Sequence, residues 1–190
     1  MQGINKKTLR QKLQKQRAAL ADRPLKSEVI CQTLLNLPLY QAAKVIHCYL
    51  PMRSEVDTRP FLTSALAQGK KIVVPIVSDE GNELIHSWLN TFKVEDLQIG
   101  LLKTLQPRNL YPVLGEVWEL VIVPLLAFDR QGYRLGYGKG FYDRFLAKTS
   151  KPTVGVAFAG QEVLNIPHEA HDIPLNWLIT EREILNITER

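Results

Sequence analysis

The sequence predicts an α/β protein: one three-layer α/β/α domain built around an open, mostly parallel sheet. Two observations lead to this prediction. Short apolar runs rich in β-branched residues, such as residues 71–75 and 120–124, alternate with longer segments of helical periodicity. Continuous apolar strands of this kind are typical of parallel sheets, because helices cover both faces. A chain of 190 residues can bury a sizeable core, so we expect a single domain over residues 1–190.

Composition narrows the class of protein. A hydrophobic fraction of 45% with 23% charged residues is typical of a soluble globular protein. The net charge of +5 favours polyanionic partners, either nucleic acids or phosphorylated and polycarboxylate small molecules. Cys31 and Cys48 lack metal-ligand spacing and indicate buried, reduced thiols. No run has membrane-spanning length and no secretory signal is present, so we expect a cytoplasmic protein without membrane contact.

The N-terminal segment predicts a basic amphipathic helix from residue 5 to about residue 21. Leu9, Leu13 and Leu20 mark one face, and lysines and arginines occupy much of the rest. A solvated basic face is one interpretation of this pattern. A transit peptide is disfavoured, because the segment contains no serine and a second helical pattern follows directly at residues 25–37.

A parallel β-α-β unit is expected next. Residues 45–50 predict a buried strand, and Glu55 lies in the loop that follows it. Asp57 or Thr58 then caps a helix, which leads to the strand at residues 71–75. Without further information, Glu55 would be interpreted as a solvated loop acid.

The remaining segments complete the expected sheet. Residues 83–88 predict a strand that is antiparallel to its predecessor, because the turn formers at 79–82 precede it. Residues 90–115 are expected to be irregular, and they either contact a substrate or cover the sheet edge. Residues 153–158 and 177–180 predict the last strands.

The chain is organised around residues 134–143, which follow the strand at 120–124. Gly136, Gly138 and Gly140 alternate with other residues, so the backbone there can approach a ligand closely or adopt positive φ angles. A helix that begins after the last glycine would direct its free amides and positive dipole end at an anion. The pattern therefore predicts a phosphate site, with a simple strand-turn-helix connection as the alternative.

Charged residues within this stretch add candidate chemistry. Lys139 and Arg134 are the catalytic candidates, because positive charge positions a polyphosphate and stabilises charge during phosphoryl transfer. Asp143 is a candidate Mg²⁺ ligand. The stretch is not a Walker A loop, because Tyr133 stands where that loop needs its first glycine and Gly140 where it needs Ser or Thr.

The run LVIVPLLAFDRQGYRLGYGKGFYDRFLA, residues 120–147, resembles the signature of the 5-formyltetrahydrofolate cyclo-ligase family. The resemblance extends to residues 6–10, 49–58 and 167–174, and so covers almost the whole chain. It implies ATP-dependent conversion of 5-formyltetrahydrofolate to 5,10-methenyltetrahydrofolate, with release of ADP and phosphate through a phosphorylated formyl (imidate) intermediate. It also implies Mg²⁺ as cofactor, ATP as co-substrate, and a monomer that acts on small molecules in one-carbon metabolism.

The resemblance further implies which residues form the site. The ATP-binding set is Lys6, Lys7, Thr8, Leu9, Arg10, Arg134, Leu135, Gly136, Tyr137, Gly138, Lys139, Gly140, Phe141 and Tyr142. The folate-binding set is Arg10, Leu50, Glu55, Tyr137, Gly138, Lys139, Gly140 and Phe141. Asp143 is the implied metal ligand. Many members carry a second acid at the position that we match to Asn176, whose neutral amide oxygen attracts a hard cation less strongly.

Three alternatives stay open. His168 and His171 suggest a metal site, although ordinary loop histidines are the simpler interpretation. A sugar-phosphate isomerase or a CoA-transferase-like protein would use the glycine stretch to bind phosphate without cleaving ATP. A nucleic-acid-binding module would use the basic N-terminal helix, but no stretch interleaves basic and aromatic residues as single-strand binders do.

Overall fold

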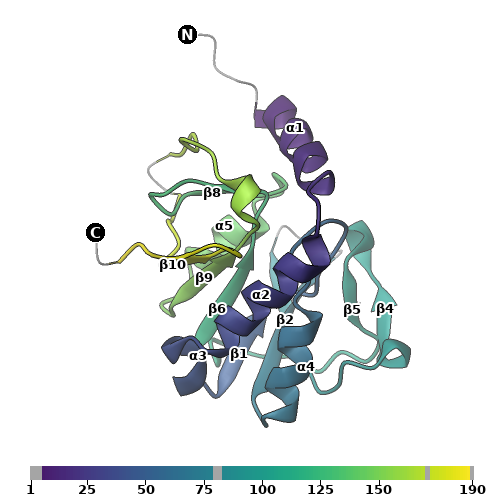
Figure 1. Cartoon of the computed structure of the whole chain (residues 1–190). Helices are drawn as coiled ribbons and strands as arrows, with labels where there is room; N and C mark the ends of the chain where they lie inside the picture. The colour runs from purple at the N-terminus through teal and green to yellow at the C-terminus, as the bar shows by residue number, and fades with distance from the viewer. Residues whose placement is uncertain (1–5, 79–82, 170–171, 189–190) are drawn as a thin grey trace.

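The computed structural model of the chain describes residues 6–78, 83–169 and 172–188, with only the backbone of residue 6. Within these residues a seven-stranded sheet forms the centre of the molecule (Figure 1). Its parallel strands are β1 (Val45–Cys48), β2 (Lys71–Val77), β6 (Leu120–Pro124), β9 (Thr153–Val156) and β10 (Trp177–Ile179). Its edges are the antiparallel strands β3 (Leu84–Leu89) and β11 (Ile184–Asn186). The predicted α/β fold with a mostly parallel sheet is confirmed.

The strand order is β11-β10-β9-β6-β1-β2-β3, so β1 and β6 lie at the centre. Side chains alternate between two cores, one on each face of the sheet. On β2, Ile72 and Val74 enter one core while Val73 enters the other. Strands buried on both faces explain the continuous apolar runs of the sequence.

Helices cover both faces, which gives three layers. Helices α2 (Arg23–Leu35), α3 (Pro38–Ala42) and α4 (Arg59–Ala67) supply the first core with side chains such as Leu34, Tyr40 and Phe61. The short helix α5 (Phe141–Leu146) supplies Phe145 and Leu146 to the second core. Figure 1 shows α2 and α4 side by side across the strands. No helix in the described part of the chain is long and apolar enough to cross a membrane.

Helix α1 (Lys6–Ala18) lies apart from these layers, at the top of the view in Figure 1. It packs near the hairpin of β7 (Ala127–Phe128) and β8 (Arg134–Leu135). Its buried Leu13 belongs to a small third core with Leu126, Leu135 and Ile166. The apolar stripe predicted from the sequence therefore packs on the protein, and it brings the basic residues of α1 to the glycine stretch.

Residues 90–115 contain more regular structure than expected. Strands β4 (Leu97–Ile99) and β5 (Leu105–Pro107) form an antiparallel hairpin. One short 3₁₀ helix, Val94–Asp96, precedes β4, and a second, Leu101–Lys103, connects the two strands. Leu102 and Lys103 have positive φ angles of 53° and 61°, a conformation that is strained for residues with side chains. Strands of three residues leave too short a pattern for sequence reasoning to detect.

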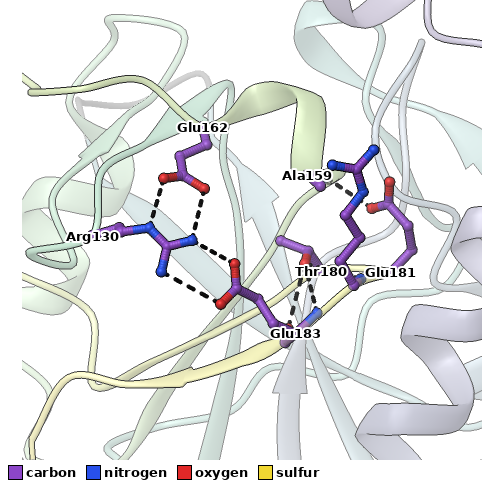
Figure 2. A network of polar contacts seen from close by, with 7 residues as sticks. Arg130, Ala159, Glu162, Thr180, Glu181 and Glu183 are labelled. Atoms are coloured by element: carbon purple, nitrogen blue, oxygen red, sulfur yellow. Dashed lines mark hydrogen bonds and ion pairs between the residues drawn. The ribbon is translucent and has the colours of Figure 1, made fainter.

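A polar network fastens the C-terminal hairpin to the rest of the fold (Figure 2). Arg130, in the turn after β7, donates to Glu162 at 2.8 Å and to Glu183 at 2.6 Å. Glu181 accepts the backbone N–H of Ala159 at 2.8 Å. The side chain of Arg130 is about half exposed, so these ion pairs stabilise the fold modestly.

Candidate functional site

A cavity opens at the carboxyl ends of the central strands. Five of the residues that line this cavity lie at or near the ends of these strands. They are Leu50 after β1, Pro75 and Val77 near the C-terminal end of β2, Pro124 at the end of β6, and Leu125 directly after it. These strands are neighbours in the sheet. Ligands of open α/β sheets bind at such an edge, so the cavity lies where the fold class predicts a site.

The glycine loop, residues 136–140, forms one wall of this cavity between β8 and α5. Gly138 and Gly140 have φ angles of 93° and 71°, which other residues rarely adopt. A Cβ atom at Gly138 would lie 2.8 Å from Cζ of Arg10, whose Nε donates to the carbonyl of Gly136 at 3.1 Å. Helix α1 therefore contacts the loop directly, because glycine leaves room for the arginine.

Positive charge gathers around the loop. Lys139 and Arg10 line the cavity, and Arg144 donates to the carbonyl of Lys139 at 2.9 Å. Arg134 also lines the cavity, but its side chain is only 4% exposed and its guanidinium is engaged within the protein. It donates to Asp143 at 2.7 Å and to the carbonyl of Ile173 at 3.0 Å. Burial lowers the pKa of Arg134, and the neighbouring carboxylate of Asp143 opposes that effect.

Two carboxylates face this positively charged wall. Asp143 has a half-exposed side chain, and Asp172 lines the same cavity and accepts the backbone N–H of Glu169 at 2.8 Å. Asn176 lies elsewhere, since its amide oxygen accepts the backbone N–H and the hydroxyl of Thr153 at 2.8 and 3.0 Å. The acid that the fold brings to the site thus comes four residues before the position that we matched from the sequence.

The lining of the cavity also includes a buried acid. Glu55 is 8% exposed, and its carboxylate accepts the backbone N–H of Met52 at 2.9 Å. Burial raises the pKa of Glu55, while the N–H of Met52 and the charge of Arg17 act to lower it. The expectation of a solvated loop acid is therefore wrong, and Glu55 is positioned to accept hydrogen bonds from a ligand.

The β4-β5 hairpin supplies part of the apolar lining. Leu102, Thr104 and Leu105 reach the cavity from this hairpin, and Leu84 reaches it from β3. Of the two expectations for residues 90–115, substrate contact therefore fits their position better than simple cover of the sheet edge.

Most residues of the predicted site meet at this cavity. The lining contains Arg10, Leu50, Glu55, Arg134, Leu135, Gly136, Tyr137, Gly138, Lys139, Gly140, Phe141, Tyr142 and Asp143. Lys7, Thr8, Leu9 and Asn176 are not part of it. The side chain of Lys6 lies outside the described residues, so its predicted ATP contact stays a prediction.

Of the two histidines near the C-terminus that suggested a metal site, the structure describes His168. His168 stacks on the ring of Tyr133 at a centroid distance of 3.6 Å, and its Nδ1 contacts the carbonyl of Ile166 at 3.0 Å. His171 lies outside the described residues. Among the residues that are described, no group of three or more His, Cys, Asp or Glu side chains is arranged to hold a metal ion.

Comparison with known proteins now places the chain. Residues 2–181 match the model of the 5-formyltetrahydrofolate cyclo-ligase family. The chain belongs to this family. A cyclo-ligase of Haemophilus influenzae is 33% identical over 152 residues, which cover 77% of this chain and 80% of the relative. A mouse cyclo-ligase is 30% identical over 193 residues, 93% of both chains.

The solved structures agree with this assignment. The NMR structure of 5,10-methenyltetrahydrofolate synthetase from Aquifex aeolicus is 32% identical and superposes with a TM-score of 0.82. The match covers 97% of this chain and 93% of that structure. Membership of the cyclo-ligase family makes the chain an enzyme of folate metabolism that acts on small molecules. It also favours the expected cyclo-ligase over the isomerase and nucleic-acid-binding alternatives.

Proposed function

We propose that this enzyme converts 5-formyltetrahydrofolate to 5,10-methenyltetrahydrofolate at the expense of ATP, with ADP and phosphate as products. The observation that carries the proposal is the cavity at the carboxyl edge of the sheet. One part of its lining is the glycine loop with adjacent basic side chains, which suits a triphosphate. Another part is a buried carboxylate with apolar residues, which suits a pterin.

The reaction needs ATP because a formamide oxygen is a poor leaving group. In the proposed sequence the formyl oxygen attacks the γ-phosphorus and ADP departs. N10 of the folate then attacks the activated formyl carbon, which closes the five-membered ring. The C–O bond breaks, phosphate leaves with the former formyl oxygen, and the N10 proton passes to solvent. The enzyme contributes chiefly by positioning both substrates and stabilising charge.

The phosphate half of the site consists of Lys139, Arg10 and the amides of the glycine loop. An exposed lysine at the cavity wall can follow the transferred phosphoryl group, whereas the fork of Arg10 suits paired oxygens. Arg134 is predicted to be catalytic, and its hydrogen bond to Asp143 supports a role in orienting that carboxylate.

The folate half is built around Glu55 and Leu50. The pterin ring presents N–H donors, and the carboxylate of Glu55 can accept them inside the cavity. Tyr137 and Phe141 line the space between the two halves and offer aromatic faces for the pterin or its linker. Leu102 and Leu105 of the β4-β5 hairpin add apolar surface to the lining of the cavity.

Asp143 and Asp172 are the proposed Mg²⁺ ligands. Both line the cavity, and oxygen donors that leave positions for phosphate and water suit this hard cation. When bound, Mg²⁺ neutralises phosphate charge and orients the triphosphate. Asn176 is not proposed as a ligand, because Thr153 occupies its amide oxygen. We further propose that the chain acts as a single-domain monomer in the cytoplasm.

The direct test mixes purified protein with 5-formyltetrahydrofolate, ATP and Mg²⁺ and follows the near-ultraviolet band of methenyltetrahydrofolate. ADP release is measured in parallel. The band should grow only with ATP present, with one ADP formed for each product. Folded protein that produces neither the band nor ADP would refute the proposed function and leave only a shared fold.

A further inference from the structure

Arg17, in the last turn of α1, is buried to 2% exposure, and all of its nitrogens donate hydrogen bonds. Its Nε donates to the hydroxyl of Ser54 at 3.1 Å and its Nη1 to the carbonyl of Leu125 at 3.0 Å. Its Nη2 donates to the hydroxyl of Tyr137. One side chain thus joins the loop after β1, the end of β6 and the glycine loop.

Burial of the charged side chain of Arg17 costs free energy, and packing alone does not require a charge at this position. A buried guanidinium loses its hydration, which only a full set of hydrogen bonds can offset. Helix α1 is already anchored by Leu13 in the third core. An apolar residue at position 17 would fill the same space without the desolvation cost of a buried guanidinium. The charge therefore indicates a functional role beyond packing.

The hydroxyl of Tyr137 connects Arg17 to the folate half of the site. It accepts the hydrogen bond from Arg17 and interacts with the carboxylate of Glu55, which also accepts the backbone N–H of Met52. Tyr137 and Glu55 line the cavity, whereas Arg17 lies behind them and does not. Contact between Arg17 and a ligand in the cavity is therefore indirect.

We propose that Arg17 is a positioning residue for the folate substrate: it fixes the hydroxyl of Tyr137 and, through it, the orientation and charge of Glu55. This inference rests on the proposed function. It also divides α1 into two roles. Arg10 and Arg17 are seven residues apart, nearly two helical turns, and so share one face. Arg10 contacts the glycine loop at the phosphate half, and Arg17 supports the folate half.

The charge of Glu55 depends on its surroundings, which come from four elements. The titratable and charged groups that face it are Arg17, Tyr49, Arg53, Tyr137 and Tyr142. Burial raises the pKa of Glu55, and Arg17 is among the groups that lower it. Removal of Arg17 would raise that pKa further, so the ionised acceptor would be lost at a higher pH.

The experiment compares the wild-type enzyme with R17M, R17K and Y137F. R17M removes the charge at similar length, R17K keeps the charge without the fork, and Y137F removes only the hydroxyl. K15M, on the exposed side of the same turn, is the matched control. Steady-state kinetics for both substrates, the pH profile of kcat/KM and Tm are measured for each protein.

R17M should raise the KM for 5-formyltetrahydrofolate about tenfold or more, the loss expected for a charged hydrogen bond, with less than about twofold change in the KM for ATP. The acidic limb of its kcat/KM profile should move to higher pH. Y137F should show a smaller effect in the same direction, and R17K should recover part of the affinity. The R17M/Y137F double variant should bind folate no worse than R17M, because both changes break one connection.

A purely structural Arg17 would give a lower Tm with both KM values and the pH profile unchanged, and that result would overturn the proposal. If R17M does not fold, the test relies on Y137F. A KM for 5-formyltetrahydrofolate and a pH profile of Y137F that match those of the wild type would also overturn the proposal. Failure of the proposed function is a separate result, because the wild-type enzyme itself would then form no methenyl product.

Discussion

We propose that the phosphate half of the site depends most on Lys139. Its side chain is exposed at the cavity wall, where truncation removes little packing. We expect Lys139→Ala to lower kcat about 10²- to 10³-fold, as loss of one electrostatic stabiliser does, and to change the free energy of unfolding by less than about 0.5 kcal/mol. Methenyl formation and thermal denaturation measure the two effects.

Lys148→Ala is the matched control for this prediction. Lys148 is also exposed and makes an ion pair with Glu83 at 2.7 Å, and it does not line the cavity. Exposed pairs of this kind contribute little, so its activity and stability should stay near those of the wild type. Equal loss of activity in the two variants would contradict the role of Lys139.

Asp172 and Asn176 are two candidate positions for the second metal-linked residue. The fold brings Asp172 to the cavity, whereas the comparison of sequence motifs indicated Asn176. Asp172→Asn should raise the Mg²⁺ concentration for half-maximal activity about tenfold, because one charged ligand becomes neutral. Asn176→Ala should leave that concentration unchanged and lower the free energy of unfolding by about 1–2 kcal/mol, since Thr153 loses two hydrogen bonds. Mg²⁺ titrations of activity that gave the reverse pattern would restore Asn176 as the metal-linked residue.

His47 is buried and His86 is partly buried, and the two rings give the stability of the protein a pH dependence. Nε2 of His47 lies 3.2 Å from Nδ1 of His86, and Trp118 and Phe145 surround the two rings. Burial lowers the pKa of His86 from 6.5 to about 4, and burial and the neighbouring ring lower that of His47. Below pH 6.5 these two histidines therefore bind protons in the unfolded chain more readily than in the folded protein.

Stability should accordingly fall as pH decreases from 6.5 toward about 4. The slope is at most about 1.4 kcal/mol per pH unit for each histidine, and less for His86 because its ring is partly exposed. His86→Gln should flatten this dependence. Urea denaturation at pH 7.5 and pH 5 measures it, and the difference between the two proteins removes the carboxylate contributions. Parallel pH profiles would contradict the assignment.

At the scale of elements, the glycine loop packs against α1 through Gly138 and Arg10. Gly136, in the same loop, provides a control position. Gly138 has a positive φ and contacts Arg10, so Gly138→Ala should cost about 1–2 kcal/mol of stability and displace that arginine. Gly136 has open space around it and no positive φ, so Gly136→Ala should leave Tm unchanged. Any loss of activity in Gly136→Ala then reports close approach of a ligand. Equal Tm for both variants would contradict this account of the loop.

The elements differ in how well the sequence predicts them. The strand at 120–124 carries its own signal, since burial on both faces leaves a continuous apolar run. The β4-β5 hairpin lacks such a signal, because its strands have three residues each. Arg17 resembled the solvated lysines beside it, and only the positions of Ser54 and Tyr137 reveal its burial. A single sequence does not contain that long-range information.

For the molecule as a whole, strand order decides the location of the site. The first half of the chain supplies α1, β1 and β2, and the second half supplies β6, the glycine loop and α5. The parallel arrangement brings their ends to one edge, so Glu55 and Lys139 line a common cavity although they are distant in sequence. The sequence motifs predicted the residues, and the topology explains why they meet.

We propose that the γ-phosphoryl group of ATP is transferred to the formyl oxygen of the folate in this cavity. The most direct measurement uses 5-formyltetrahydrofolate whose formyl oxygen is labelled with oxygen-18, in a single turnover with ATP and Mg²⁺, and determines the label in the phosphate by mass spectrometry. We expect one labelled oxygen in each phosphate that accompanies methenyltetrahydrofolate. Phosphate without the label, with the label released into water, would show that ATP cleavage does not activate the formyl oxygen and would contradict the account.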